Sequence, residues 1–275
     1  MRILGLIFDF YIQSSLHVGL AVLALAHCTL LQLHLPQPPH FLATVFLGTV
    51  LGYNVLKYAE LVCLGKVKSA WYRAIVFCTV LAAVCFAIEL YQLSPVQQFL
   101  FLSAGLWVLC YPFLRRYGWF KLFFVSAAVT YITVFIPLWT GSHNTELLFQ
   151  LIQRFFLLSS LLIPFEIWDS ANDPLSLYTL PQRLGIPKTK LLGYGLLIPF
   201  LILIAWQSNG QVASLVVALL AALSIYFTRP IRTKYYTSFW VESVPIVWWV
   251  VLLFCWFSFK FQVSSCANYT KWYTI

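Results

Sequence analysis

The chain has 275 residues, of which 61% are hydrophobic and 9% are charged, and its formal net charge is +9. So apolar a composition excludes an ordinary water-soluble domain and places most residues against lipid or against one another. The positive charge lies mostly in short joints between apolar runs, which is typical of membrane topology and contact with anionic lipid rather than of a nucleic-acid-binding surface.

The chain opens on an apolar stretch, residues 1–14, that carries Arg2 and Asp9 and has no small-residue cleavage site. We predict an amphipathic helix lying on the membrane surface rather than a signal peptide, with a signal anchor as the alternative.

Nine apolar runs follow, each of about 20 residues, which is the length that one bilayer crossing needs. Because the bilayer core offers no water to the backbone, each run is predicted to be a helix. The runs are 15–34, 39–62, 72–92, 95–113, 119–140, 146–168, 189–207, 210–228 and 238–260. The predicted fold class is therefore an all-α membrane protein, a single bundle of about nine transmembrane helices over residues 15–260, followed by a tail, 261–275.

Lys and Arg residues occupy the joints after the second, fourth, sixth and eighth runs, whereas the opposite joints contain none. They are Lys66, Lys68, Arg73, Arg115, Arg116, Lys121, Arg183, Lys188, Lys190, Arg229, Arg232 and Lys234. Because short loops rich in Lys and Arg stay in the cytoplasm, we predict a cytoplasmic N-terminus, an outer tail and residence in the cytoplasmic membrane.

The seven cysteines are scattered, form no C-x-x-C pair and lie mostly within the apolar runs, so they are assigned no chemistry. Cys266 lies on the predicted outer tail, next to the sequon Asn268-Tyr269-Thr270, and is the cysteine to test for a disulfide.

Three of the eight acidic residues lie together at the end of the sixth run: Glu166, Asp169 and Asp173. On a helix that extends so far, this spacing puts them within about 60° of one another on one face. Clustered carboxylates at a membrane need a cation, and oxygen ligands favour Mg²⁺, which bridges readily to phosphate. A solvated helix end is the structural alternative.

Basic residues on the same predicted side complement these acids. The segment "YPFLRRYGWFK", residues 111–121, ends the fourth run, with Pro112 predicted as a helix stop. A diphosphate is held by metal ions on one side and by Arg or Lys on the other, so Arg115, Arg116 and Lys121 are predicted to bind phosphate. Taken singly, each arginine is better explained as an ordinary residue of a cytoplasmic loop, and only together with the acids does a phosphate-binding role explain it equally well.

Together these motifs resemble the UbiA-type intramembrane prenyltransferases. The acids take the positions of D-x-x-D-x-x-x-D in the second aspartate-rich segment of that family. The other matching residues are Thr179, Leu180, Pro181 and Gly185 behind the acids, and Tyr111, Pro112, Arg115 and Arg116 for Y-P-x-x-K-R. The resemblance implies a nine-helix bundle with a cytoplasm-facing cavity, where Mg²⁺ and a polyprenyl diphosphate bind and the prenyl group passes to an aromatic or lipid acceptor.

The first aspartate-rich segment departs from the family pattern N-D-x-x-D-x-x-x-D. Asn54 keeps the asparagine, but Val55, Tyr58 and Val62 stand where aspartates are expected, and Glu60 falls between those positions. Lys57 has three interpretations. It replaces the lost metal as the counter-charge of the diphosphate, which we prefer; it pairs with the acids of the second segment in a protein that binds lipid without chemistry; or its ammonium reaches up to the headgroups.

The predicted catalytic residues are Asp169, Asp173, Glu166 and Asn54, with Mg²⁺ held by Glu166, Asp169 and Asp173. The predicted substrate-binding residues are Arg115, Arg116, Lys121, Lys57, Tyr111 and Tyr58. Abundant aromatic residues would line the isoprenoid tunnel. The alternatives to prenyl transfer are an impaired relative that binds isoprenoid lipid and an intramembrane terpene cyclase. A transporter is disfavoured, because the sequence has no internal repeat or paired broken helices.

Three further polar residues in or near the apolar runs have weaker predictions. His17 is a candidate base toward the acceptor or an interfacial residue. Glu242 is expected to face the bundle and pair with a base of the last basic joint, and Arg154 is expected to pair with Glu146.

Overall fold

The computed structural model describes residues 2–64, 69–114, 117–139, 144–171, 178–207 and 210–256, and within these ranges it contains helices and no strand. The elements are α1 (Arg2–Gln13), α2 (Leu16–Gln32), α3 (Pro39–Cys63), α4 (Ala70–Tyr91), α5 (Pro95–Leu114), α6 (Phe120–Thr130), η1 (Tyr131–Phe135), α7 (Ile136–Leu138), α8 (Asn144–Leu161), α9 (Ile163–Asp169), α10 (Leu180–Leu184), α11 (Ile186–Ile204), α12 (Gln211–Phe227) and η3 (Tyr236–Val241). The segment that begins with η3 continues as a helical span to Trp256, and we call Tyr236–Trp256 the last span.

The helices follow the predicted apolar runs. Seven described segments are long and apolar enough to cross a membrane, and an eighth results if α1 and α2, which are bent by 55° at their joint, count as one span. α12 is apolar but shorter. The chain is therefore an integral multi-pass membrane protein of the predicted all-α class, although the described segments do not establish the predicted count of nine.

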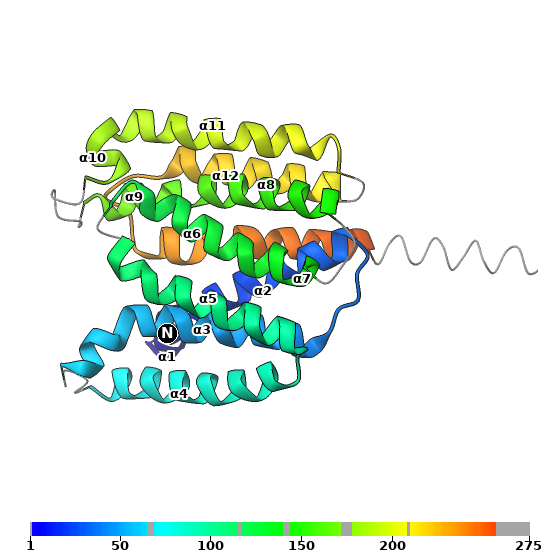
Figure 1. The fold of residues 1–275 in the computed structure, drawn as a ribbon. Coiled ribbons are helices and arrows are strands. Elements are labelled where there is room, and N and C mark those ends of the chain that lie inside the picture. Colours follow the sequence, from blue (N-terminus) through cyan, green and yellow to red (C-terminus); the bar gives the residue numbers. More distant parts are fainter. Residues whose placement is uncertain are drawn as a thin grey trace, which may run out of the picture.

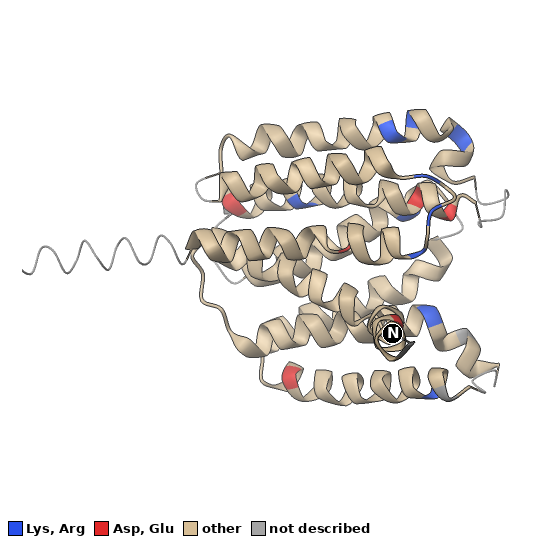
Figure 2. Ribbon diagram, turned by 180° about the vertical axis from the view of Figure 1, so that it is seen from behind, with Lys and Arg blue, Asp and Glu red and all other residues tan. Residues whose placement is uncertain are grey.

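The spans lie side by side in one bundle, with α4 along one side and α11 along the other (Figure 1). α9 and α10 lie together at one end of this bundle. Lys and Arg residues gather at the same end (Figure 2), which we call the basic end. The alternation of basic and non-basic joints along the sequence thus places most of the Lys and Arg residues at one end of the bundle.

α2 runs between the two apolar cores of the bundle. One face, including Leu25 and Cys28, packs with α8, α9, α11, α12 and the last span, while Val22 and Ala26 pack with α3, α5 and η1. At Gly19 an added Cβ would lie only 2.7 Å from a methyl group of Val50, so glycine permits the close approach of α2 and α3. α2 therefore connects both halves of the bundle and contributes to the cavities between them.

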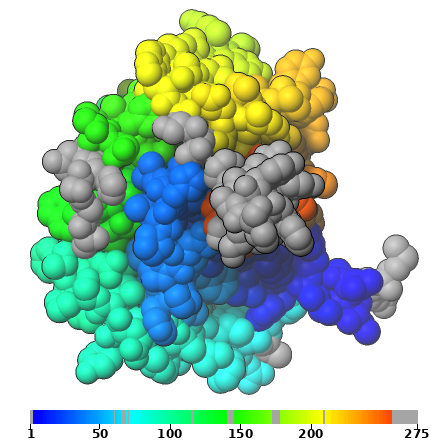
Figure 3. Space-filling model, turned by 90° about the vertical axis from the view of Figure 1, so that its right-hand side faces the viewer, coloured from blue at the N-terminus to red at the C-terminus, as the bar shows by residue number. Residues whose placement is uncertain are grey.

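α1 projects from the side of the bundle (Figure 3). Its apolar residues Ile3, Leu4, Leu6 and Ile7 are exposed, each by more than half. This arrangement is the one expected of a helix that lays an apolar face on the membrane surface, which stays a prediction.

Pro112 does not stop a helix, contrary to the prediction from the sequence, because α5 continues through it to Leu114. Proline is tolerated within transmembrane helices, where neighbouring groups satisfy the freed carbonyl.

Candidate active site

Two neighbouring cavities lie inside the bundle. The first, of about 440 Å³, lies between α2, α3, α6, α9 and the last span, and we call it the charged cavity because lysines and carboxylates interrupt its apolar wall. The second, of about 460 Å³, lies between α3, α5 and α6, and we call it the apolar cavity. The residues that line both are Val22, Tyr53, Lys57, Tyr111, Val125 and Val129. Both walls are mostly apolar, and Lys57 and the phenol side chains of Tyr53 and Tyr111 belong to both linings.

α9 brings two of the predicted acids into the charged cavity. Pro164, in its first turn, has no N–H to continue the hydrogen bonds of α8, and the helix breaks between Leu161 and Ile163. Glu166, only 3% exposed, and Asp169 follow at a spacing of one helical turn and both line the cavity. α9 ends at Asp169, and Asp173 lies outside the described residues.

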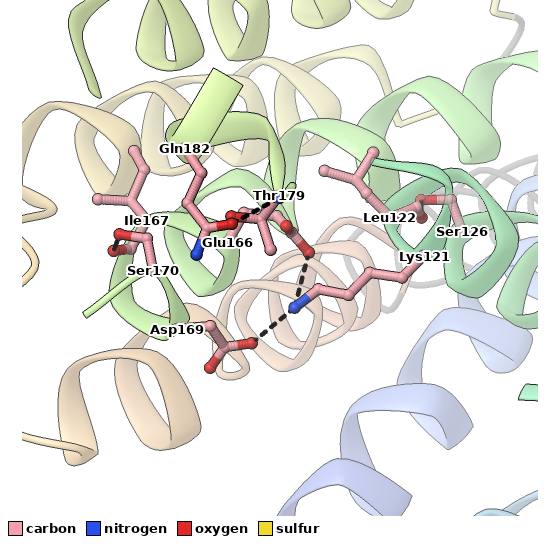
Figure 4. Close-up of polar contacts among 9 residues, drawn as sticks. All are labelled: Lys121, Leu122, Ser126, Glu166, Ile167, Asp169, Ser170, Thr179 and Gln182. Carbon is pink, nitrogen blue, oxygen red and sulfur yellow. Dashed lines mark hydrogen bonds and ion pairs between the residues drawn. The ribbon is translucent and has the colours of Figure 1, made fainter. Parts of the chain in front are cut away.

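Lys121 joins these two carboxylates (Figure 4). It is the second residue of α6 and is 6% exposed. Its Nζ donates to Asp169 Oδ2 at 3.1 Å and lies 3.3 Å from Glu166 Oε1. The structure thus brings together one predicted phosphate-binding lysine and two predicted metal ligands, and it makes them ion-pair partners.

Lys57 and Glu242 face the same cavity from α3 and the last span. Lys57 Nζ donates to Ser15 Oγ at 3.1 Å. Among the described residues Glu242 forms no ion pair with a base of the last basic joint, where Lys234 lies against Asp9 instead. Lys234, also in the lining, lies 3.7 Å from Asp9. The described lining therefore holds three lysines and three carboxylates, and these charges balance.

The segment predicted as a degenerate catalytic motif holds the joint between α1 and α2. Three of its side chains donate to residues of that joint: Tyr58 Oη to Gln13 O at 2.8 Å, Asn54 Nδ2 to Ser14 O at 3.0 Å, and Lys57 to Ser15. Asn54 is buried, and neither Asn54 nor Tyr58 is among the described residues that line the two cavities. Lys57 alone of the three both holds the joint and reaches the charged cavity.

We expect Asn54→Ala to lower the free energy of unfolding by about 1–3 kcal/mol, because it leaves the buried Ser14 carbonyl without its partner. Asn54 also donates to Thr79 Oγ1 at 3.0 Å, and this hydroxyl donates to the Ile75 carbonyl at 2.8 Å. Thr79→Val is therefore the matched variant, because it removes these two bonds and spares the joint. Denaturation of both variants in detergent should rank N54A as the less stable. Equal stabilities of the two variants would contradict the inference that Asn54 holds the joint between α1 and α2.

The other predicted substrate residues have mixed placements. Tyr111 lines both cavities and stacks on Phe124 with ring centroids 6.5 Å apart. Arg115 and Arg116 lie outside the described residues. The Thr179–Gly185 motif forms α10, where the Thr179 N–H donates to Gln182 Oε1 at 2.9 Å and Gly185, with φ 78°, ends the helix. The Thr and Gly of that motif thus begin and end the short helix α10.

His17 is buried and both of its ring nitrogens have protein partners. Nδ1 is 2.9 Å from Tyr11 Oη, and Nε2 is 3.1 Å from the carbonyl of Phe239 in the last span. The ring also stacks on Phe239. His17 therefore ties α1, α2 and the last span together, and it does not line either cavity among the described residues.

Arg154 does not make the expected pair with Glu146. Eight residues separate them on one helix, which is about 12 Å along its axis, whereas side-chain pairs need a spacing of three or four. Arg154 is 1% exposed and donates to Leu25 O at 2.7 Å and to Thr29 Oγ1 at 3.0 Å. Its guanidinium lies 4.7 Å from the Trp248 ring centroid, so cation–π contact replaces a carboxylate.

No protein-family model and no curated protein sequence matches the chain. Two solved structures do. A UbiA homologue from Aeropyrum pernix K1 aligns with a TM-score of 0.63 and 14% identity, over 86% of this chain and 97% of that chain. The chain has the UbiA fold. A digeranylgeranylglyceryl phosphate synthase aligns with a TM-score of 0.53 and 12% identity, over 92% of this chain and 97% of that chain. Both confirm the predicted UbiA-like architecture along nearly the whole chain.

The described residues of this UbiA fold do not fit a magnesium ion in the arrangement observed. Glu166 and Asp169 supply two carboxylates, but an ammonium already lies between them. Within the described ranges no group of three or more His, Cys, Asp or Glu side chains is placed to hold a metal ion.

Proposed function

We propose that the chain is an intramembrane prenyltransferase, which moves a polyprenyl group from its diphosphate to an aromatic or lipid acceptor. The observation that carries this proposal is the cluster of Glu166, Asp169 and Lys121 inside a cavity whose wall is otherwise largely apolar. The UbiA fold supports the same reaction class, because it is shared with a synthase of a prenylated lipid.

The reaction breaks the C–O bond of an allylic diphosphate and leaves a carbocation and an anionic diphosphate. A catalyst must stabilise the leaving group and exclude water from the cation. In the charged cavity the ammonium groups of Lys57, Lys121 and Lys234 offer positive charge to phosphate oxygens, and Tyr111 and Trp168 offer aromatic faces to the cation. The acceptor then bonds to the cationic carbon and loses a proton.

Mg²⁺ held by Glu166, Asp169 and Asp173 stays part of the expectation that the resemblance supplies. A metal there would neutralise the departing diphosphate. Because Lys121 occupies the position between the first two acids, we assign no step to the metal.

The test is a screen of the purified protein in neutral detergent against isoprenyl diphosphates of several lengths, each with and without an aromatic or lipid acceptor and with and without Mg²⁺. Release of diphosphate and formation of a prenylated product are read together. We expect both to require the acceptor. Diphosphate release without an acceptor, accompanied by a rearranged hydrocarbon, would instead identify a terpene cyclase.

A second candidate function is binding of isoprenoid lipid without chemistry. It is favoured by one observation, that the Lys121 ammonium already forms ion pairs with both acids. In that case the same diphosphates bind, but none is cleaved under any metal.

We also propose that the basic end faces the cytoplasm of a cytoplasmic membrane. Cys63, exposed and free at the end of α3, is a natural reporter of that side. With the other cysteines removed, a membrane-impermeant maleimide should label Cys63 in inside-out vesicles and leave it unlabelled in right-side-out vesicles. Ser94→Cys without Cys63, at the exposed turn before α5, should give the reverse pattern. Exchange of the two patterns would overturn the orientation.

A further inference from the structure

A lysine of the protein itself already lies between the two acids of α9 and offsets one of their two negative charges. The side chains of Glu166 and Lys121 are 4% and 7% exposed, and a buried charge is tolerated only where an opposite charge and hydrogen bonds compensate it. Lys121 Nζ satisfies that need for two carboxylates at once, at 3.3 Å and 3.1 Å. This is the position that a bridging cation between clustered acids would occupy.

The charges of the described lining lead in the same direction. This lining contains Lys57, Lys121 and Lys234 beside Glu166, Asp169 and Glu242. A divalent cation that entered beside Lys121 would turn the cluster of Glu166, Asp169 and Lys121 from one net negative charge to one net positive charge, in surroundings that are mostly apolar. Such a charge is costly where water is scarce.

We propose that Lys121 is a resident counter-ion that takes the position of a metal ion between Glu166 and Asp169, so that the resting site holds no divalent cation. The inference deepens the proposed function, on which its meaning for catalysis rests. The ion cluster itself exists without turnover, so it can be tested without an activity assay.

The experiment measures Mn²⁺ binding and thermal stability in neutral detergent. Purified wild-type protein should leave the Mn²⁺ electron paramagnetic resonance signal that of the free ion, and neither Mn²⁺ nor Mg²⁺ should raise its Tm. Lys121→Met removes the ammonium at similar volume, so its Tm should fall and then rise with added Mn²⁺ or Mg²⁺, as ligand binding to the folded state requires. Adding Glu166→Gln to K121M should abolish that rise.

Lys57→Met is the matched control, because Lys57 lines the same cavity but donates to Ser15 rather than to the α9 acids. K57M should show no rise in Tm with Mg²⁺. Stoichiometric Mn²⁺ binding by the wild-type protein would overturn the inference. This measurement uses only the wild-type protein, so it does not depend on whether a variant folds. A folded K121M that ignores both cations would also overturn it. Failure of the proposed function looks different: no variant releases diphosphate, while K121M still gains stability from the cations and the wild-type protein and K57M do not.

Discussion

Asp169→Asn should reduce kcat/KM for diphosphate release by about 100-fold or more, because Asp169 holds the Lys121 ammonium that would face the phosphates, and loss of one preorganised electrostatic group typically costs that much. Asp169 is the more exposed acid of the cluster, with 35% of its side chain accessible, so it faces the space that substrate would enter. Asparagine has nearly the same shape as aspartate, and the substitution leaves the Lys121–Glu166 ion pair in place, so the fold should survive. Initial rates with the donor and acceptor found in the screen provide the measurement.

Glu89→Gln is the control for that variant. Glu89 lies near the end of α4 and contacts His40 at 2.8 Å, and it lines neither the charged nor the apolar cavity among the described residues. Its activity should equal that of the wild type. If D169N retained the activity of E89Q, the α9 carboxylates would have no part in turnover.

Lys121→Met should lower the free energy of unfolding by about 3–5 kcal/mol, the usual cost of removing one partner of a buried ion pair. The cost arises at Glu166, whose buried carboxylate would lose its counter-charge, more than at the partly exposed Asp169. Equilibrium denaturation in detergent micelles without divalent cations measures the change.

Two comparisons isolate that cause. The double variant K121M/E166Q should recover much of the loss, because it removes the uncompensated charge together with its partner. Lys188→Met removes an exposed lysine of α11 and should change stability little. A K121M protein as stable as K188M would show that the buried cluster does not form as described.

Most of the fold could be predicted because each apolar run must satisfy its own backbone in lipid, which leaves the helix as the only local structure. Where prediction failed, a neighbour decided the outcome. Pro112 is predicted as a stop, yet the packed bundle carries α5 past it. The joint between α1 and α2 is held by Asn54 and Tyr58, which lie on α3. The sequence around the joint therefore does not predict the bend.

The site was predictable to the extent that it is local. Glu166 and Asp169 share a face because they are three residues apart, and Lys121 was placed at their level by the alternation of basic joints. What Lys121 does there was not predictable, because a lysine suits a phosphate and a carboxylate equally well. Only the folded bundle, in which the Lys121 side chain reaches from α6 to α9, selects the acids. Arg154 illustrates the same limit, since its partner Trp248 belongs to the last span.

The central claim is that the charged cavity binds an isoprenyl diphosphate with its phosphates at the α9 acids and their lysine. The most direct measurement is a structure of the wild-type protein with a non-cleavable isoprenyl diphosphate analogue. The phosphates should lie within hydrogen-bond distance of Lys121 or Lys57, with the chain along the apolar lining shared by the two cavities. An analogue bound elsewhere in the bundle, with the Glu166–Lys121–Asp169 cluster undisturbed and no phosphate beside it, would contradict the account.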